Sequence, residues 1–145
     1  MAIISIENQK QIVWDFIRKH SLGVLATTNA KGNPEAAVIE FSERESFELI
    51  FDTFAIYRKY ENIRKNPNVA VVIGWDENIT VQYEGTALEL SGKELKECQK
   101  IHIAKLPDSA KFMSMMGVTY FKTIPKWIRY SDLTVFPWRI FELEF

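Results

Sequence analysis

Cysteine, long apolar runs and an excess of either charge are nearly absent from this sequence, and each absence excludes a class of protein. The single cysteine, Cys98, cannot form a disulfide bond within the chain. No apolar run approaches the roughly 20 residues that span a bilayer. Eighteen basic and nineteen acidic residues give a formal net charge of −1. We therefore expect no overall field that attracts nucleic acid or an anionic membrane.

The start of the sequence lacks a charged segment followed by an apolar one, the pattern of a secretory signal, so we expect a cytoplasmic protein. Internal repeats, low-complexity tracts and linkers rich in Gly, Ser or Pro are also missing. The 145 residues therefore predict a single domain over residues 1–145. With 47% hydrophobic and 13% aromatic residues, this domain has enough apolar material for a packed core.

Several segments have the apolar spacing or the composition of helices. Residues 8–20 place four apolar side chains on one face: Ile12, Val13, Phe16 and Ile17. Further helices are predicted over residues 54–65 and 93–105. Leu106-Pro107 ends the last of these, and a shorter helical piece follows over residues 110–116.

Strand patterns occupy most of the remaining chain. Alternating apolar and polar residues between turn residues predict strands over 22–29, 34–41, 46–53, 68–75, 79–90, 122–132 and 133–145. Ser42–Glu45 reads as a turn, and in the strand after it Phe47, Leu49 and Phe51 alternate with Glu48, Ile50 and Asp52. Short turns between consecutive strands favour an antiparallel sheet. Six or seven such strands, rich in aromatic residues, predict a mainly β protein that closes into a small barrel with flanking helices.

The junction between the third strand and the second helix is a candidate anion site. Thr53 or Asp52 is the expected N-cap of a helix over residues 54–65, whose first turn leaves backbone N–H groups free. Arg58 and Lys59 follow, so a phosphate monoester could bind there. An alternative is that these cations only form part of a solvated helix face, because such faces are common. In either case Ile56, Tyr60 and Ile63 are the expected buried stripe.

The order of motifs in the first two thirds of the chain resembles a known family. The hairpin LATTNAKGNPEAAVIEF, a strand ending in Thr53, the segment RKYENIRKNPNVAVVIG and the strand VQYEGTALEL occur in this order. They resemble the FMN-binding split-barrel proteins related to pyridoxamine 5'-phosphate oxidase, from about residue 22 to residue 90 and more loosely beyond. The resemblance implies a six- to seven-stranded antiparallel split β-barrel and strengthens the phosphate interpretation of the junction.

The resemblance also implies a set of site residues. Arg58 and Lys59 would hold the FMN phosphate, with Thr53 close to the cofactor. The strand residues Val38, Ile39 and Glu40 would offer backbone groups to the polar edge of the flavin ring, and Thr80 would assist from another strand, on the same face as Gln82. The flavin would lie at the interface of a homodimer, so Trp127 and Arg129 are expected from the neighbouring subunit, although core or rim packing is the alternative for both.

The sequence departs from the family pattern at several positions. Tyr57 stands where relatives often carry a small hydroxyl residue, and Ala36-Ala37 stand where the oxidases place an arginine. The Tyr, Arg and Ser set that binds the substrate phosphate has no match in residues 96–116, and the C-terminal Arg-x-His motif is missing. We therefore expect an FMN-dependent oxidoreductase whose small-molecule substrate is not pyridoxamine phosphate.

Two other interpretations follow from the same residues. Some split-barrel relatives bind haem, and His102 is the candidate axial ligand, with a packed or surface histidine as its alternative. The protein is then a flavin or haem carrier or sensor without turnover. A barrel that has lost its cofactor and serves as a structural or stress-response dimer is the third interpretation. His20, His102 and one cysteine form no zinc pattern, Cys98 reads as an inert thiol, and no catalytic residue is assigned.

Overall fold

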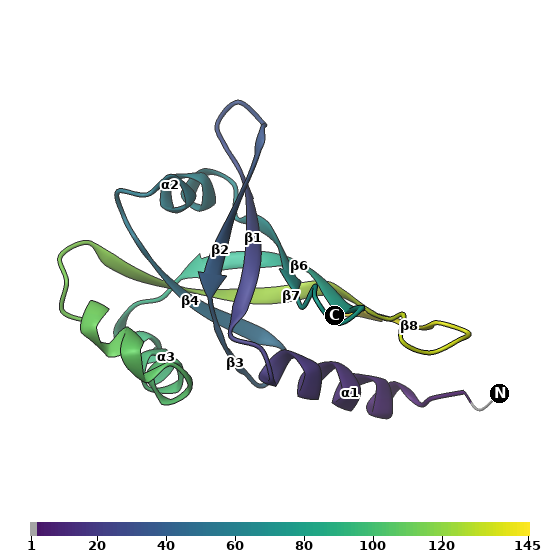
Figure 1. The fold of residues 1–145 in the computed structure, drawn as a ribbon. Helices are drawn as coiled ribbons and strands as arrows, with labels where there is room; N and C mark the ends of the chain where they lie inside the picture. Colours follow the sequence, from purple (N-terminus) through teal and green to yellow (C-terminus); the bar gives the residue numbers. More distant parts are fainter. Residues whose placement is uncertain (1–2) are drawn as a thin grey trace.

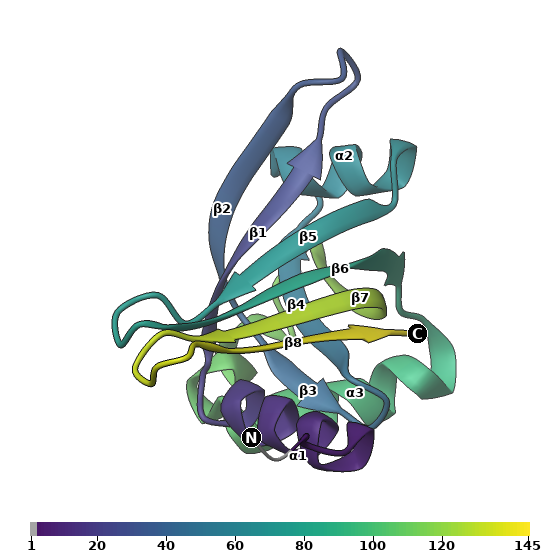
Figure 2. The ribbon, with the colours of Figure 1, turned by 90° about the vertical axis from the view of Figure 1, so that its right-hand side faces the viewer.

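A computed structural model describes residues 3–145 and shows one strongly curved antiparallel sheet with helices against it (Figures 1 and 2). The strands are β1 (Leu22–Thr28), β2 (Pro34–Glu40), β3 (Ser42–Arg44), β4 (Glu48–Phe54), β5 (Asn68–Ile73), β6 (Ile79–Glu89), β7 (Val118–Asp132) and β8 (Arg139–Glu144). The helices are α1 (Ile6–Arg18), α2 (Arg58–Lys65), α3 (Gly92–Lys105) and the 3-10 helix η1 (Pro107–Phe112).

The mainly β, antiparallel split-barrel prediction is confirmed, with one more strand than expected. The additional strand is β3, which has three residues and read as a turn in the sequence. The short helical piece also lies earlier than predicted, at Pro107–Phe112 rather than residues 110–116, with the proline in its first turn. Proline is favoured there because the first N–H groups of a helix need no partner within it.

The strand β7 organises the sheet. The strands pair in the order β2-β1-β5-β6-β7-β4-β3, and β8 also pairs with β7. One edge of β7 pairs with β6 along most of its length. The other edge pairs first with β4, from Val118 to Thr123, and then with β8, from Trp127 to Asp132. The barrel is split because β4 and β8 diverge from β7 at this change of partner.

A bulge beside Gly85 lies at the same place. The register of β6 on β7 shifts between Glu84 and Gly85, and Gly85 faces Pro125. A Cβ atom built on Gly85 would lie 2.3 Å from the carbonyl oxygen of Ile124, which is closer than real Cβ contacts. Glycine is therefore required because the two backbones approach too closely for any side chain.

The barrel interior holds the main core. Inward residues of the strands, among them Leu25, Val71 and Tyr83, are buried together. Val13, Phe16 and Ile17 of α1 join this core, so α1 covers one end of the curved sheet (Figure 2). The amphipathic N-terminal helix is thus confirmed. Among residues 3–145, no helix combines the length and the apolar character that crossing a bilayer needs.

A second, smaller core lies on the outer face of β4 and β7, under α3. Ile50, Leu90, Cys98 and Tyr120 are buried there. The strand β4 is therefore covered on both faces, and Ile50, predicted on the polar face of β4, is fully buried. Arg44 donates a hydrogen bond to the Cys98 sulfur at 3.1 Å, and burial raises the pKa of this thiol. Cys98 is thus a packed thiol with little thiolate at neutral pH.

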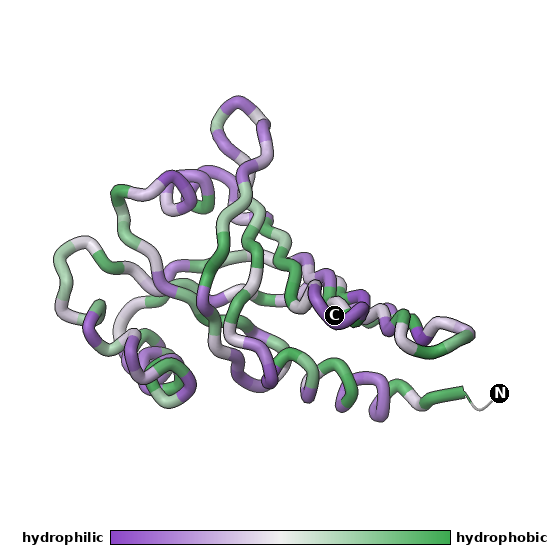
Figure 3. Tube along the Cα trace, viewed as in Figure 1, coloured by the Kyte–Doolittle hydropathy of each residue, from purple (hydrophilic) through white to green (hydrophobic). Residues whose placement is uncertain are grey.

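The predicted start of the second helix was wrong. The helix α2 begins at Arg58, with Tyr57 as its N-cap, and neither Thr53 nor Asp52 caps it. Both residues instead belong to β4, because β4 stays paired with β7 as far as Phe54, opposite Val118. Ile56 falls in the turn before α2 and is 88% exposed, whereas Ile63 is buried as predicted. Figure 3 shows that α2 is mainly hydrophilic.

Replacing Gly85 by alanine tests the close approach in the barrel. The new Cβ must displace the Ile124 carbonyl, so we expect Gly85→Ala to lower the free energy of unfolding by about 2–3 kcal/mol in urea denaturation. The adjacent change Thr86→Ala, on the outer face of β6, is the matched control and should cost less than about 1 kcal/mol. Equal midpoints for the two variants would show that Gly85 is not required.

Candidate functional site

The start of α2 leaves backbone donors without side-chain partners. Tyr57, the N-cap residue, has extended backbone angles (φ −84°, ψ 150°) and its side chain caps none of the first N–H groups. Uncapped N–H groups and the helix dipole together favour an anion at this end. The local sequence explains this, because a tyrosine hydroxyl is too far from its own backbone to act as serine or threonine does.

Two cavities meet at this helix start. The larger, which we call the α2–η1 cavity, has a volume of about 380 Å³ and is lined by Val38, Ile39, Glu40, Asp52, Thr53, Phe54, Tyr57, Lys59, Asp108, Ser109, Lys111 and Phe112. The second, the α2–β2 cavity, has about 240 Å³ and is lined by Leu25, Thr27, Glu35, Ala36, Ala37, Tyr57, Arg58 and Lys59. Tyr57 and Lys59 line both cavities, so the helix start lies between them.

The structure thus brings six of the predicted site residues together. Val38, Ile39, Glu40, Thr53 and Lys59 line the α2–η1 cavity, and Arg58 lines the α2–β2 cavity. The hydroxyl oxygen of Thr53 is buried and has no hydrogen-bond partner among the described residues. A buried polar atom without a partner is costly, and a ligand group in the cavity would satisfy it.

The two cations differ in their surroundings. The Arg58 side chain is 82% exposed, and its Nε lies 3.4 Å from a carboxylate oxygen of Glu35. Lys59 is partly buried, with its Nζ 5.4 Å from the centre of the Tyr57 ring, and burial lowers its pKa. Lys59 is therefore the cation that the fold holds within the site, whereas Arg58 is held at its edge by an ion pair.

Glu35 and Asn62 are site residues that the sequence did not indicate. Asn62 of α2 donates hydrogen bonds to Thr27 at 3.0 Å and to Glu35 at 2.9 Å. Asn29 donates a hydrogen bond to the other carboxylate oxygen of Glu35. The hydrogen bonds from the two asparagine side chains lower the pKa of Glu35. These contacts fix α2 on the β1–β2 hairpin. Their only sequence signal is an asparagine on the apolar face of a helix, which does not identify its partners.

The four remaining predicted residues lie elsewhere in the subunit. Thr80, Gln82, Trp127 and Arg129 are on the outer face of β6 and β7, and none of them lines either cavity. Gln82 faces Arg129 across the two strands, and Arg129 forms an ion pair of 3.1 Å with Glu142. These four residues can belong to the same site as the two cavities only if a second subunit brings them there, so their role stays a prediction.

A buried polar cluster lies beside the α2–η1 cavity, under α3. The His102 ring is fully buried, with Nδ1 2.7 Å from the Ser42 hydroxyl and Nε2 3.7 Å from Oδ2 of Asp52. Within residues 3–145, Nε2 of His102, Oδ2 of Asp52 and the hydroxyl of Tyr120 have no hydrogen-bond partner. Burial, with the Lys105 charge, lowers the pKa of His102 to about 4. Burial and the charge of Glu40 raise the pKa of Asp52.

Comparison with known proteins identifies the family. Residues 10–130 match the sequence profile described as pyridoxamine 5'-phosphate oxidase, which covers well over half of the chain. The chain belongs to the pyridoxamine 5'-phosphate oxidase family. The comparison with curated proteins returns no match.

Several solved structures share the fold of this chain. A haem binding protein from Mycobacterium smegmatis has a TM-score of 0.80 at 14% identity, covering 99% of this chain and 60% of its own. A pyridoxamine 5'-phosphate oxidase-related, FMN binding protein from Nostoc punctiforme has 0.73 at 15%, covering 97% and 91%. General Stress Protein 26 from Bacillus anthracis has 0.69 at 23%, covering 93% and 98%. The chain thus spans about 60% of the length of the M. smegmatis protein.

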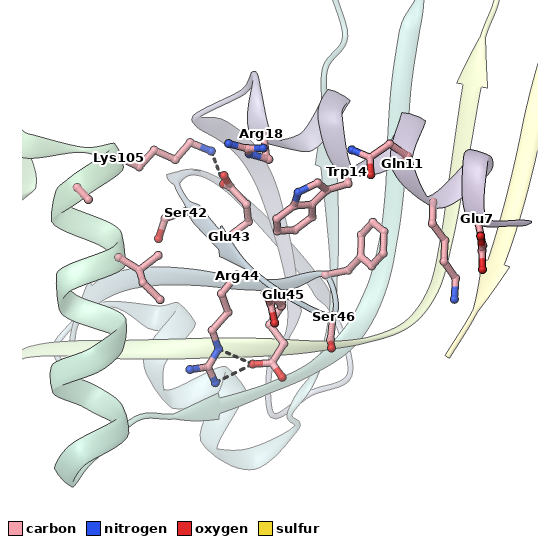
Figure 4. A pocket seen from close by; sticks show the side chains of 15 residues that line it. Glu7, Gln11, Trp14, Arg18, Ser42, Glu43, Arg44, Glu45, Ser46 and Lys105 are labelled. Carbon is pink, nitrogen blue, oxygen red and sulfur yellow. Dashed lines mark hydrogen bonds and ion pairs between the residues drawn. The ribbon is translucent and has the colours of Figure 1, made fainter.

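A larger cavity of this family member lies away from the helix start. It has about 1270 Å³ and lies between α1, the β3–β4 turn and α3 (Figure 4). Its central charged side chains are already paired, Lys105 with Glu43 and Arg44 with Glu48. None of the predicted site residues lines it. Size alone therefore does not make it the candidate site, and we place that site at the two smaller cavities.

Burial of neutral His102 should make this family member sensitive to acid. The unfolded chain takes up the His102 proton below about pH 6.5, whereas the folded protein takes it up only near pH 4. Stability should therefore fall by up to about 3 kcal/mol as the pH drops through this window. The raised pKa of Asp52 acts in the opposite direction, because its proton stabilises the folded state below that pKa.

The variant His102→Gln separates the two contributions, because it removes the imidazole and keeps Asp52. Urea denaturation at several pH values should show that the wild-type protein loses more stability than the variant between pH 6.5 and 4. Parallel stability profiles would show that His102 does not carry the effect.

Proposed function

We propose that this protein binds FMN with the phosphate at the start of α2, and that it is an FMN-dependent oxidoreductase. The observation that carries the proposal is Lys59, a partly buried cation that lines both cavities beside the uncapped helix start. Lys59 has no carboxylate partner among the described residues, so burial destabilises its ammonium group, and a bound phosphate dianion would compensate this. Membership of the pyridoxamine 5'-phosphate oxidase family supports the same ligand.

The residues present fit an FMN molecule. Lys59, the α2 N–H groups and Thr53 would hold the phosphate end, with Arg58 at the edge. The strand β2 lies at the end of the strand order, so the backbone of Val38–Glu40 has a free edge for the polar side of the ring. Bound FMN supplies hydride or electron transfer, with a reduced nicotinamide or a small organic molecule as the donor. The protein binds and orients it and limits access of water.

Pyridoxamine phosphate is not the proposed substrate. Where the oxidases carry an arginine on the second hairpin strand, Ala36 and Ala37 line the α2–β2 cavity and offer no charge. A second substrate phosphate would lack a cation there.

A cytoplasmic location is part of the proposal, and it is supported by the single cysteine, which is buried and unpaired.

A homodimer that completes the site is the second part of the proposal. A row of register partners crosses five neighbouring strands, from β2 to β7. In strand order it consists of Val38, Val24, Val72, Gln82 and Arg129. Val38 is 62% exposed and Val72 37% exposed, and Leu22 adds further apolar surface. An apolar patch of this kind on a sheet face is typical of subunit interfaces. Pairing through it would place Gln82 and Arg129, with Thr80 and Trp127 beside them, at the interface.

One observation favours a cofactor-free protein. Arg58 lies mainly in solvent and its charge is already paired with Glu35. The haem alternative has less support, because His102 is fully buried and its free nitrogen faces Asp52 rather than an open cavity. A structural or stress-response dimer is therefore the second candidate, and a carrier without turnover differs from the enzyme only in lacking reduction by a substrate.

Titration with FMN tests the main proposal. We expect saturable quenching of flavin fluorescence, and a loss of affinity of about tenfold or more in Lys59→Ala, because a hydrogen bond to a charged group contributes about 1.5–3 kcal/mol. Arg64→Ala, in the last turn of the same helix, is the matched control and should bind as the wild type does. A colourless protein that takes up no FMN would favour the cofactor-free candidate.

Reduction separates an enzyme from a carrier. In the FMN-loaded protein, NAD(P)H should bleach the flavin absorption if the protein is an oxidoreductase. A bound flavin that no reduced nicotinamide bleaches would leave the carrier. Added haemin that gives a Soret band in place of flavin uptake would support the haem alternative.

The variant Val72→Glu tests the dimer without touching either cavity. A carboxylate in the apolar patch should convert the dimer to a monomer in size-exclusion chromatography with light scattering. The monomer should bind FMN at least tenfold more weakly, if the partner contributes to the site. Gln82→Glu, at the polar end of the same row, is the milder comparison. A monomer that retains FMN would contradict the shared site.

A further inference from the structure

Asp52 connects the α2–η1 cavity with the buried cluster under α3. Thr53 points into the barrel, and the neighbouring Asp52 points to the opposite face of β4, towards α3. The Asp52 side chain is 22% exposed and lines the cavity, yet its Oδ2 atom is buried and faces Nε2 of His102. One carboxyl group thus contacts both a ligand cavity and a fully buried imidazole.

We propose that Asp52 takes up a proton when a molecule binds in the α2–η1 cavity and then donates a hydrogen bond to it, and that His102 is the positioning residue that stabilises the Asp52 carboxylate of the unliganded protein. This inference rests on the proposed function for the identity of that molecule, FMN. It assigns the two residues roles that differ from those expected from the sequence, in which Asp52 is a candidate N-cap and His102 a candidate haem ligand.

The surroundings of Asp52 suit a group that changes its protonation. Glu40 faces it from β2, Tyr120 from β7 and His102 from α3, and Lys59, Asp108 and Lys111 line the same cavity from α2 and η1. Burial and the negative charge of Glu40 favour the protonated carboxyl, and the pKa of Asp52 is raised accordingly. A neutral carboxyl can donate a hydrogen bond, which a carboxylate cannot do.

His102 can stabilise the Asp52 carboxylate of the unliganded protein. Its ring is neutral at physiological pH, because burial lowers its pKa to about 4. When the Ser42 hydroxyl donates to Nδ1, the proton of the neutral ring lies on Nε2, which faces Asp52. The present Nε2–Oδ2 distance of 3.7 Å is slightly beyond hydrogen-bond length, so a small side-chain rotation closes the bond.

The step is a proton uptake without redox change. Above its pKa, Asp52 of the unliganded protein is a carboxylate that can accept a hydrogen bond from Nε2–H of His102. When an acceptor oxygen of the ligand lies beside it, Asp52 takes a proton from the buffer acid, and the new O–H group donates a hydrogen bond to that oxygen. The proton returns to the buffer when the ligand leaves.

Calorimetric counting of protons tests the proposal. FMN binding is measured by isothermal titration in buffers of different ionisation enthalpy, from about pH 4 to about pH 7, and the slope against that enthalpy gives the protons exchanged. We expect the wild type to take up as much as about one proton more than Asp52→Asn in part of this range. Asp108→Asn, on the exposed side of the same cavity, should match the wild type.

Two changes at His102 test its positioning role. His102→Leu removes the N–H donor, so the extra proton should be taken up at higher pH than in the wild type. His102→Gln retains an N–H donor and should move the profile back towards the wild type. If His102→Leu does not fold, the numbers of protons taken up by the wild type, Asp52→Asn and His102→Gln decide whether Asp52 takes up the extra proton and whether the imidazole ring shifts its pH range.

The possible failures are distinct. If FMN binds and the wild type and Asp52→Asn exchange equal numbers of protons, the inference is wrong and the proposed function stands. An Asp108→Asn variant that loses the extra proton to the same extent would also overturn it, because the effect would then belong to the charge of the cavity. A wild-type protein that binds no FMN would refute the proposed function, and this inference with it.

Discussion

The pairing of β4 with β7 is the constraint on which the candidate site depends. Their backbone hydrogen bonds continue to Phe54, opposite Val118. Since side chains alternate along a strand, this pairing sends Thr53 into the barrel and Asp52 under α3. Because the pairing keeps β4 extended as far as Phe54, α2 begins only at Arg58. The helix start therefore faces the space between β2 and β4 rather than the end of β4 itself. One ladder thus sets the position of the cations, the buried hydroxyl and the carboxyl group.

Paired and unpaired charges lie side by side at the start of α2. Glu35 is fully engaged by Asn29, Asn62 and Arg58, and this network fixes α2 on the β1–β2 hairpin. Lys59 has no such carboxylate partner within residues 3–145 and is partly desolvated. A protein that keeps an unpaired cation half-buried gains stability when an anion binds there, because ligands that bind only the folded state stabilise it. The polar network and the unpaired lysine therefore have different functions on the same short helix.

Much of the fold could be predicted from the sequence, because its signals are local. Alternation identified seven strands, and helical spacing identified α1 from Val13, Phe16 and Ile17. The strand β3 could not be predicted, since three residues are too few to show alternation. The start of α2 was misplaced because Phe54–Tyr57 carry no breaker residue, and only pairing with β7 keeps Phe54 extended. Of the candidate site, the resemblance gave the residues around α2. The contact of Asp52 with His102 joins residues 50 positions apart on a strand and a helix, and no local pattern encodes it.

The burial of Cys98 has a practical consequence for work on this protein. Its thiol is packed under α3 against Arg44 and has little thiolate at neutral pH, so it is a poor target for maleimides and other alkylating reagents. A new cysteine at an exposed position such as Ala110 of η1 would then be the reactive thiol of choice among the described residues. A fluorophore or spin label attached there would report on the mouth of the α2–η1 cavity without first removing the native cysteine.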